Sequence, residues 1–537
     1  MRRKATKAAA IILILVTFIV ILSPAVNGVD AQTKRFNMSY IYFGKPSTYS
    51  YYVDRTKGSL NEISPSYFNI NSEGNLEIDL SFDTNFINEM HARGVKVVPF
   101  LSNHWDRSAG RNALSKREAL AQQIATVINK YNLDGVNVDI ENLTEADREN
   151  YTDFIRILRN KLGYKKSLSV AVAPNPYNIS KGWQGSYDYA ALAKYSDYLM
   201  IMAYDESYQG GPAGPVASAS FVERSIEHAI ERVPKNKIVL GIPFYGRLWK
   251  NDGSYGGYGV SNATVEQLIQ KYNGKVTYDK NAQTPKAVIT IKAGDQKPTI
   301  LGKKLDAGTY TIWYENEQSI KYKLSLVQKY DIKGTGSWSL GQETADTWSY
   351  YDRWLNGRYF TDSEGHWAEK SIFFVEEKGW MNGVSSTKFA PDKVITRAEV
   401  AAVLVRALEL EGDTSGTSFK DTSKHWARNE IEIARQNNIV IGVGDGNFLP
   451  DNPVTRQEIA VMLDRILSLP DADEEFDNPY WDITYNKFKW SYDSILKMTY
   501  NGIFTGGTDG GFHPYEGTTR AQMAVLMERI SKYIEVK

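Results

Sequence analysis

The sequence contains no cysteine among its 537 residues. Disulfide bonds, thiolate metal sites and cysteine nucleophiles are therefore excluded. An excess of charge of either sign is also missing, because 63 lysines and arginines balance 63 aspartates and glutamates. We therefore expect no polyanionic partner such as a nucleic acid.

Long hydrophobic runs are scarce, and the clearest one lies at the start, from Ala8 to Leu22. Pro24 and small residues around Ala31 follow it, and four basic residues precede it, Arg2, Arg3, Lys4 and Lys7. This order is typical of a secretory signal peptide. The run is shorter than the roughly 20 residues that span a bilayer. We expect residues 1–31 to be cleaved, leaving no stable membrane span, although an uncleaved anchor helix is the alternative. Export without cysteine suits a bacterial cell surface.

Strand-like and helix-like patterns alternate between residues 35 and 355. Apolar, β-branched runs predict strands at 38–43, 95–101, 135–140, 168–173, 198–204, 237–245 and 336–340. Helices are expected at about 118–130, 144–162 and 221–232. The first two follow capping boxes, Ser115 with Glu118 and Thr144 with Asp147. About eight such units predict a (β/α)8 TIM barrel. Residues 252–310 break the rhythm and predict a small α+β insertion.

An internal repeat fills the sequence after about residue 358. His366-Trp367-Ala368 recurs after 59 residues, and a third tryptophan follows after 64 more. The string Thr396-Arg397-Ala398-Glu399 recurs at the same two intervals as the related strings TRQE at 455–458 and TRAQ at 519–522. The repeats are expected at 358–412, 417–470 and 476–537, with linkers at 413–416 and 470–475. One mainly helical unit of this size is too small for a good core, so we expect the three to pack together.

The strongest catalytic signal is the string from Asp134 to Glu141, DGVNVDIE. Side chains alternate along a strand, so Asn137, Asp139 and Glu141 share one face. Neighbouring carboxylates raise one another's pKa, so one carboxylic acid stays protonated and can donate its proton to a leaving oxygen. A bare D-x-E pattern is more often a polar strand end. The complete string at the carboxyl end of a barrel strand favours an active site.

The string resembles the D-x-x-D-x-D-x-E signature of glycoside hydrolase family 18, the chitinase-like barrels. Three further segments are similar to strands of that family, at 202–205 (MAYD), 241–247 (GIPFYGR) and 336–338 (GSW). The resemblance covers about residues 35–355. It implies a hydrolase without metal or cofactor in which the 2-acetamido group of the substrate is the nucleophile, an exception to two-carboxylate catalysis.

The same resemblance assigns roles to individual residues. Glu141 would protonate the glycosidic oxygen and later activate water, Asp139 would orient the acetamide, and Tyr204 would hydrogen-bond its carbonyl oxygen. The substrate-binding residues would be Asn137, Asp205, Tyr245, Arg247 and Trp338, with Trp338 beneath the sugar. As alternatives, the aromatic residues could belong to the core, and Arg247 to a structural ion pair.

Two departures from the family pattern match one of its subgroups. Asn137 replaces the middle aspartate, and residues 101–105 (LSNHW) replace S-x-G-G. Together with residues 60–65 and 210–218, these features resemble bacterial spore-cortex and cell-wall N-acetylglucosaminidases. The implied substrate is peptidoglycan or its cortex form. Many such relatives carry LysM modules, and none is visible here.

The C-terminal repeats resemble S-layer homology domains, which bind pyruvylated secondary wall polysaccharide. The resemblance implies that three arginines meet the anionic sugar, Arg397, Arg456 and Arg520. The T-x-x-E string is also a helix capping box that could serve the fold alone. We expect the three repeat tryptophans to lie in the core. In the third repeat Asp482 precedes Trp490 by more residues than in the others, which predicts a degraded site.

Together these features predict a secreted, wall-anchored endo-β-N-acetylglucosaminidase. A chitinase acting on external chitin is the alternative within enzymes, although no chitin-binding module is recognisable. A lectin-like inactive barrel and an S-layer protein with a vestigial barrel belong to other classes. The presence of Glu141, Asp139 and Tyr204 argues against both.

Overall fold

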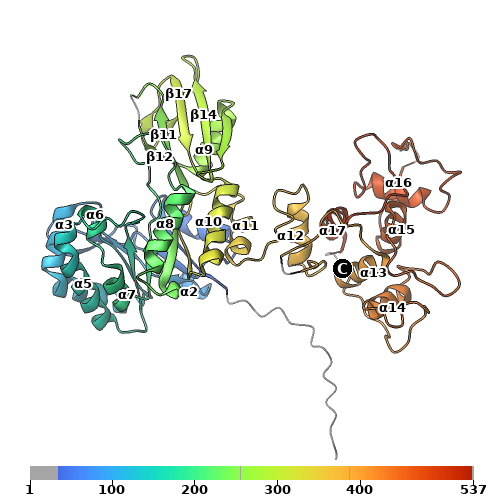
Figure 1. Cartoon of the computed structure of the whole chain (residues 1–537), viewed down its shortest axis with the longest axis horizontal. Coiled ribbons are helices and arrows are strands. Elements are labelled where there is room, and N and C mark those ends of the chain that lie inside the picture. Colours follow the sequence, from blue (N-terminus) through green and yellow to red (C-terminus); the bar gives the residue numbers. More distant parts are fainter. Residues whose placement is uncertain (1–33, 254–255, 386, 474, 535–537) are drawn as a thin grey trace, which may run out of the picture. The chain divides into compact units, whose positions relative to one another are not determined.

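The computed structural model describes residues 34–253, 256–385, 387–473 and 475–534. The chain divides into two compact units, one ending at Asn356 and the other beginning at Gly357 (Figure 1). The expected signal peptide lies outside the described residues. Within these ranges, no helix combines the length and apolar character needed to cross a membrane.

The first unit is a parallel barrel, as predicted. Its strands are β1 Phe36–Ile41, β2 Glu62–Pro65, β5 Lys96–Val97 with β6 Phe100–Ser102, β7 Gly135–Asp139, β8 Ser167–Val172, β9 Tyr198–Ile201, β10 Ile238–Pro243 and β18 Gly334–Trp338. β5 and β6 form one interrupted barrel strand. β5 pairs with β2 and β6 with β7, so the stretch between them closes the barrel. Val98 N donates to Ile63 O, and Pro99 O accepts from Asn137 N, both at 2.9 Å.

One barrel strand, β2, was absent from the predicted strands because Ile63 is its only large aliphatic residue. A short hairpin, β3 Phe68–Ile70 with β4 Leu76–Ile78, extends the sheet beside β6. The β10–β18 and β18–β1 pairings complete the series, in register from Gly334 to Trp338. All eight barrel positions therefore point their carboxyl ends to the same side, where active sites of this fold form.

Helices cover the outside of the barrel. They are α1 Tyr49–Arg55, α2 Thr84–Ala92, α3 Arg107–Ser115, α4 Arg117–Lys130, α5 Arg148–Leu162, α7 Tyr189–Tyr195, α8 Ala219–Ile230, α10 Glu317–Tyr330 and α11 Thr347–Leu355. The short helix α6 Gly182–Gly185 lies in the loop that follows β8. The capping box of Thr144 with Asp147 is confirmed ahead of α5. The capping box at Ser115 is wrong. Asp106 caps α3, so Ser115 ends that helix and its hydroxyl donates to Asn112 O.

The insertion is a five-stranded antiparallel sheet with one helix (Figure 1). Its elements are β11 Tyr245–Lys250, β12 Tyr258–Ser261, α9 Asn262–Lys271, β13 Lys275–Asp279, β14 Thr284–Ile291 and β17 Gly308–Trp313, with the hairpin β15 Thr299–Ile300 and β16 Lys303–Lys304. It extends on both sides of the expected 252–310. Only one residue separates the end of β10 from the start of β11, and β11 belongs to the insertion. Tyr245 and Arg247 are therefore part of the insertion rather than of the barrel.

The second unit contains two helices from each repeat around one shared core, as expected. The helices are α12 Glu369–Glu377 and α13 Arg397–Ala407, α14 Arg428–Gln436 and α15 Arg456–Ile466, and α16 Tyr492–Tyr500 and α17 Arg520–Ile534. α13 packs on α14, α15 on α16, and α17 on α12. Because each repeat packs on the next and the third returns to the first, the repeats form a closed ring.

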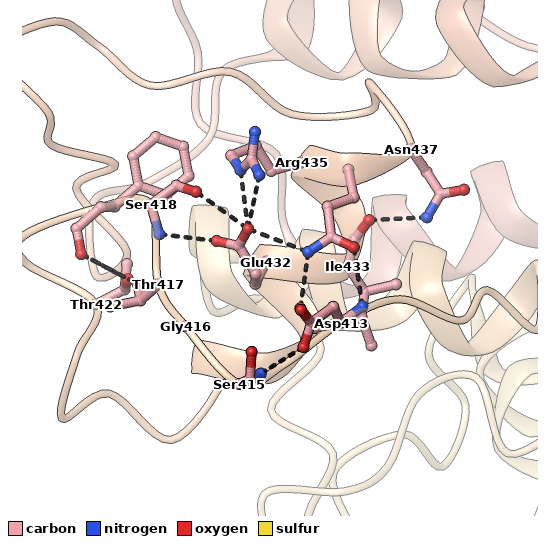
Figure 2. Close-up of polar contacts among 12 residues, drawn as sticks. Asp413, Ser415, Gly416, Thr417, Ser418, Thr422, Glu432, Ile433, Arg435 and Asn437 are labelled. Carbon is pink, nitrogen blue, oxygen red and sulfur yellow. Dashed lines mark hydrogen bonds and ion pairs between the residues drawn. The ribbon is translucent and has the colours of Figure 1, made fainter.

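The expected linker between the first two repeats is held tightly (Figure 2). Glu432 on α14 accepts hydrogen bonds from Ser418 N at 2.9 Å and from the Arg435 guanidinium at 2.8 Å. Asp413 in turn accepts from Ser415 N at 2.8 Å. Burial raises the pKa of Glu432, but these donors outweigh it and lower the pKa to about 2. Glu432 therefore stays ionised and holds Ser418, just after the linker. Gln436 of the same helix fixes the linker itself, accepting from Asp413 N at 2.9 Å and donating to Asp413 O at 2.7 Å.

Candidate active site

The signature string lies on β7, whose last residue is Asp139. Glu141 follows beyond the strand, where the backbone ladder has ended. The Asn103 side chain holds it there, accepting from Glu141 N at 2.8 Å and donating to Glu141 O at 2.9 Å. Asn142 then turns the chain away with a φ of 58°. Asn103 thus fixes the main chain of the candidate acid, a role that the local sequence pattern did not reveal.

A cleft of about 870 Å³ opens at the carboxyl ends of the barrel strands. Its lining includes seven of the predicted residues, Asp139, Glu141, Tyr204, Asp205, Tyr245, Arg247 and Trp338. Tyr204 fits because Gly241 on β10 leaves room, since a Cβ there would lie 2.9 Å from the tyrosine ring. The structure therefore brings the predicted catalytic residues and most of the predicted substrate-binding residues together.

Asn137 does not reach this lining. It is fully buried, accepts from Tyr40 Oη at 3.0 Å and donates to Ser169 Oγ at 2.7 Å. These bonds place the amide inside the barrel, below Asp139. An amide satisfies both the tyrosine donor and the serine acceptor, whereas an aspartate would add a further buried carboxyl group below Asp139.

Asp139, which is buried, and Glu141, which is half-buried, form an interacting pair of carboxyl groups. Burial raises the pKa of Asp139 to about 7. Burial also raises the pKa of Glu141, and the charges of Asp139 and Asp205 raise it further. Asp139 Oδ1 has no hydrogen-bond partner among the residues that the structure describes. The pair therefore retains a proton at neutral pH.

Asp205 ties the insertion to the barrel. Its Oδ1 accepts from Tyr245 Oη at 2.6 Å and from Arg247 at 2.8 and 2.9 Å. Arg247 also donates to Gly257 O at 2.7 Å. Arg247 therefore does form an ion pair, as the alternative reading expected, and this ion pair lies in the wall of the cleft. The same bonds position Tyr245 and leave one side of the carboxylate group for the cleft.

Aromatic rings form much of the remaining lining. Trp338 ends β18 and lies against Tyr40, with ring centroids 5.2 Å apart. Trp105 is 50% exposed and meets Trp183 with ring centroids 5.0 Å apart. Neither Trp105 nor Trp183 was a predicted site residue, although Trp105 ends the segment 101–105 and Trp183 lies in α6. Such exposed rings are suited to stacking on sugar faces.

In the second unit the three predicted arginines lie at the junctions between repeats. Arg397, Arg456 and Arg520 donate through Nε to carbonyl oxygens of the following repeat, those of Phe448, Phe512 and Phe389. The prediction of core tryptophans is wrong, since Trp367, Trp426 and Trp490 are 67%, 61% and 57% exposed. They stand just before their helices, outside the apolar faces that meet in the core.

The expected defect of the third repeat is not seen at Asp482. Its carboxylate accepts from Phe512 N and His513 N, both at 2.7 Å. Asp362 and Asp421 bind the matching backbone amides of their own repeats. The longer spacing before Trp490 is absorbed in the intervening loop, so the aspartate keeps its place.

Comparisons with known proteins agree with this geometry. The family description "Glycosyl hydrolases family 18" matches residues 39–343, and "S-layer homology domain" matches residues 359–401, 418–460 and 485–524. Among solved structures, a chitinase from Chromobacterium violaceum is similar, with a TM-score of 0.52 and 26% identity. The match covers 60% of this chain and 99% of that one.

Two curated relatives come from Bacillus subtilis strain 168. The uncharacterized glycosylase YvbX is 28% identical over 266 residues, which is 47% of this chain and 73% of that protein. The cortical fragment-lytic enzyme is 28% identical over 238 residues, and the chain spans 52% of its length. Both matches involve a glycosylase or lytic enzyme. The chain therefore belongs to glycosyl hydrolase family 18 and is a glycoside hydrolase that also carries three S-layer homology domains.

Proposed function

We propose that this enzyme cleaves β-1,4 bonds at N-acetylglucosamine in peptidoglycan or spore cortex, while its repeats hold it on the cell wall. The observation that carries the proposal is the pair of carboxyl groups with raised pKa values, Asp139 and Glu141, in the lining of a cleft that Trp338 also lines. Asp139 is the second acid of the pair but lies deeper, 5% exposed, on the strand itself. This favours a supporting role for Asp139 over attack on the sugar.

In the proposed reaction the substrate supplies the nucleophile. Glu141 donates its proton to the glycosidic oxygen as that bond breaks, and the acetamide oxygen of the same sugar bonds to the anomeric carbon. Asp139 accepts the acetamide N–H through its unpartnered Oδ1 and stabilises the positive oxazolinium. Tyr204 donates to the acetamide oxygen. Glu141, now ionised, takes a proton from a water molecule whose oxygen bonds to the anomeric carbon. The bond from that carbon to the acetamide oxygen breaks, which restores the acetamide and the protonated Glu141 and retains the configuration.

The other cleft residues hold the sugar and the acids in place. Trp338 stacks under the reacting sugar, and Tyr245, Arg247 and Asp205 bind its polar edge. Asn137 lies below Asp139 inside the barrel, where it bonds to Tyr40 and Ser169. The presence of the other residues in the cleft lining supports their proposed roles.

Two observations support a wall glycan as substrate. The curated relatives include a cortical fragment-lytic enzyme, and the S-layer homology domains associate the chain with cell-wall polysaccharide at the cell surface. We propose that Arg397, Arg456 and Arg520 contact the anionic sugar of this polysaccharide, as the sequence resemblance implies. A chitinase remains the second candidate, favoured by the likeness to the Chromobacterium violaceum chitinase.

The test is digestion of purified peptidoglycan, spore cortex and chitin, with mass spectrometry of the products. We expect new reducing ends at N-acetylglucosamine from peptidoglycan or cortex. Glu141→Gln should lower the rate by about 10²- to 10⁴-fold, the usual contribution of a general acid. Glu149→Gln, the same change in the exposed first turn of α5, is the matched control. Products from chitin alone would favour the second candidate, and an active Glu141→Gln enzyme would refute the proposed acid.

A further inference from the structure

A chain of buried polar side chains crosses the barrel beneath the cleft. Its members are Tyr40 on β1, Asn137 on β7, Ser169 on β8, Tyr198 on β9 and Glu62 on β2. Each of the five is at most 2% exposed, and none belongs to the cleft lining. The chain includes a buried carboxyl group, that of Glu62, which has no part in the proposed reaction.

Hydrogen bonds connect each member to the next. Tyr40 Oη donates to Asn137 Oδ1 at 3.0 Å, and Asn137 Nδ2 donates to Ser169 Oγ at 2.7 Å. Ser169 stands opposite both Asn137 and Tyr198 in the parallel ladder, and its hydroxyl group also hydrogen-bonds to Tyr198. Tyr198 Oη donates to Glu62 Oε1 at 2.6 Å. The chain therefore leads from Tyr40 to Glu62 without a break.

The chain has a direction because each hydroxyl group has only one proton to donate. Tyr198 donates its proton to Glu62, so it must accept from Ser169. Ser169 then has no proton left for Asn137 and accepts from the amide nitrogen instead. The amide oxygen of Asn137 is left to face Tyr40, which donates to it. The acceptor at Glu62 thus determines where the proton of Tyr40 points.

The surroundings of Glu62 keep it an acceptor. The Ser167 hydroxyl group donates to its Oε2 at 3.4 Å. Burial raises the pKa of Glu62 to about 7 and the charge of Asp134 adds to this effect, whereas Tyr198, Ser167 and the charge of Lys96 oppose it. A proton on Oε2 still leaves Oε1 to accept from Tyr198, since the Ser167 hydroxyl can accept as well as donate. The direction of the chain is therefore the same in both protonation states.

The other end of the chain lies near the catalytic pair. Asn137 precedes Asp139 by two residues on the same face of β7. Burial raises the pKa of Tyr40, and the charges of Asp139, Glu62 and Glu141 raise it further. The Tyr40 proton nevertheless goes to Asn137, and Asp139 Oδ1 has no hydrogen-bond partner in the part of the chain that is described. This is the oxygen that accepts the acetamide N–H in the proposed reaction.

We propose that Glu62 is a positioning residue, which directs the chain so that the Tyr40 proton points to Asn137 and Asp139 Oδ1 stays free for the acetamide of the substrate. Glu62 acts through the other members and touches neither the substrate nor the reacting atoms. The inference rests on the proposed reaction and extends it to a side chain outside the cleft.

Removing the acceptor at the end of the chain lets its direction reverse. Tyr198 then donates to Ser169, and Ser169 donates to the amide oxygen of Asn137. The amide nitrogen turns to Tyr40, whose own proton becomes available to Asp139. A hydrogen bond to a carboxylate favours its charged form and lowers its pKa. The substrate acetamide would then compete with Tyr40 for the same oxygen.

Steady-state kinetics of the full chain test this, with a chromogenic aryl glycoside whose cleaved sugar carries a 2-acetamido group. The proposed reaction needs Asp139 ionised, so kcat should fall as pH drops through its pKa, which burial raises to about 7. Glu62→Met removes the acceptor with little change in volume. It should lower kcat about tenfold or more, the effect of one hydrogen bond to a charged group. It should also move the acidic limb of the pH–rate profile to lower pH by roughly one unit.

Two further variants separate the direction of the chain from charge and packing. Glu62→Gln removes the charge but keeps an oxygen that accepts from Tyr198, so kcat should stay within about threefold and the acidic limb should not move. Tyr198→Phe breaks the chain one step further along and should reproduce the effects of Glu62→Met. The other titratable groups whose charges interact with Asp139 are the same in every variant, namely Glu141, Tyr204, Tyr151 and Tyr187.

Tyr351→Phe is the matched control, because Tyr351 is also fully buried and donates to Thr335 Oγ1 at 3.1 Å, outside the chain. It should leave kcat and the acidic limb unchanged. Circular dichroism melting curves report whether each variant is folded, and if Glu62→Met is not, Tyr198→Phe decides.

The outcomes distinguish the inference from the proposed function. If the folded variants without the acceptor or the Tyr198 hydroxyl keep kcat and the acidic limb, or if Glu62→Gln loses as much activity as Glu62→Met, the role of Glu62 is refuted and the proposed reaction stands. If the unaltered chain cleaves the acetamido glycoside no faster than its 2-hydroxyl counterpart, the proposed reaction fails, and the role of Glu62 fails with it.

Discussion

Replacing Asn103 with alanine tests how the structure prepares Glu141 for catalysis. The side chain is 1% exposed and makes two hydrogen bonds to the main chain of Glu141, at 2.8 and 2.9 Å. These bonds act where β7 has already ended, so no ladder replaces them. Asn103→Ala leaves the acid group itself intact and removes what positions it.

The expected loss follows from the two bonds. Each contributes about 0.5–1.5 kcal/mol net in a folded protein, so together they restrain Glu141 by about 2 kcal/mol. If that restraint is required in the transition state, kcat falls about 30-fold, since about 1.4 kcal/mol corresponds to a factor of ten. KM should change little, because Asn103 is absent from the cleft lining.

A double-mutant cycle separates positioning from simple destabilisation. Rates are measured well below the melting temperature for Asn103→Ala, Glu141→Gln and the double variant, with Asn112→Ala on exposed α3 as control. Once the acid is removed, Asn103→Ala should reduce the residual rate by less than threefold. An equal loss in both backgrounds, or a single variant within threefold of the unaltered enzyme, would refute the positioning role.

Further predictions concern pH and stability. Burial and the charge of Asp139 raise the pKa of Glu141, and the acid must be protonated, so kcat/KM should fall as pH rises through that pKa. Asp139→Asn should move this limb of the pH–rate profile to lower pH, and an unmoved limb would contradict the coupling. Glu432→Gln should cost about 2 kcal/mol of unfolding free energy at pH 7. The pKa of Glu432 is lowered to about 2, below its unfolded value of about 4.3, so denaturant titrations should show this difference vanishing as pH falls between these values; a constant difference would exclude ionisation as the cause. Lys323 Nζ and Glu315 Oε2 form a buried ion pair 2.7 Å apart. Replacing either residue with methionine should lower the free energy of unfolding by about 3–5 kcal/mol, and replacing both should lower it by less. Additive losses in urea unfolding would disprove the pairing.

Local periodicity predicted most of the barrel and the central residues of its site. Strand alternation placed Asp139 and Glu141 on one side, and the structure has both in the cleft lining. The capping box at Thr144 was recognisable because its two partners are three residues apart. In both cases the physical cause acts between near neighbours, so the sequence alone contains it.

Features that depend on distant segments were missed or misassigned. Asn103 meets Glu141 across 38 residues, and no local pattern records that contact. Ser115 fits a capping box in sequence, but Asp106 had already started the preceding helix, which leaves Ser115 at its end.

Hydrolysis of two matched substrates tests the central claim most directly. The two glycosides differ only at the 2-position of the cleaved sugar, one with an acetamido group and one with a hydroxyl group, and proton NMR follows the first anomer released. The account predicts β-anomer from the acetamido substrate and a rate on the hydroxyl substrate lower by orders of magnitude. Comparable rates on both substrates, or release of the α-anomer first, would contradict attack by the substrate's own acetamide beside Glu141.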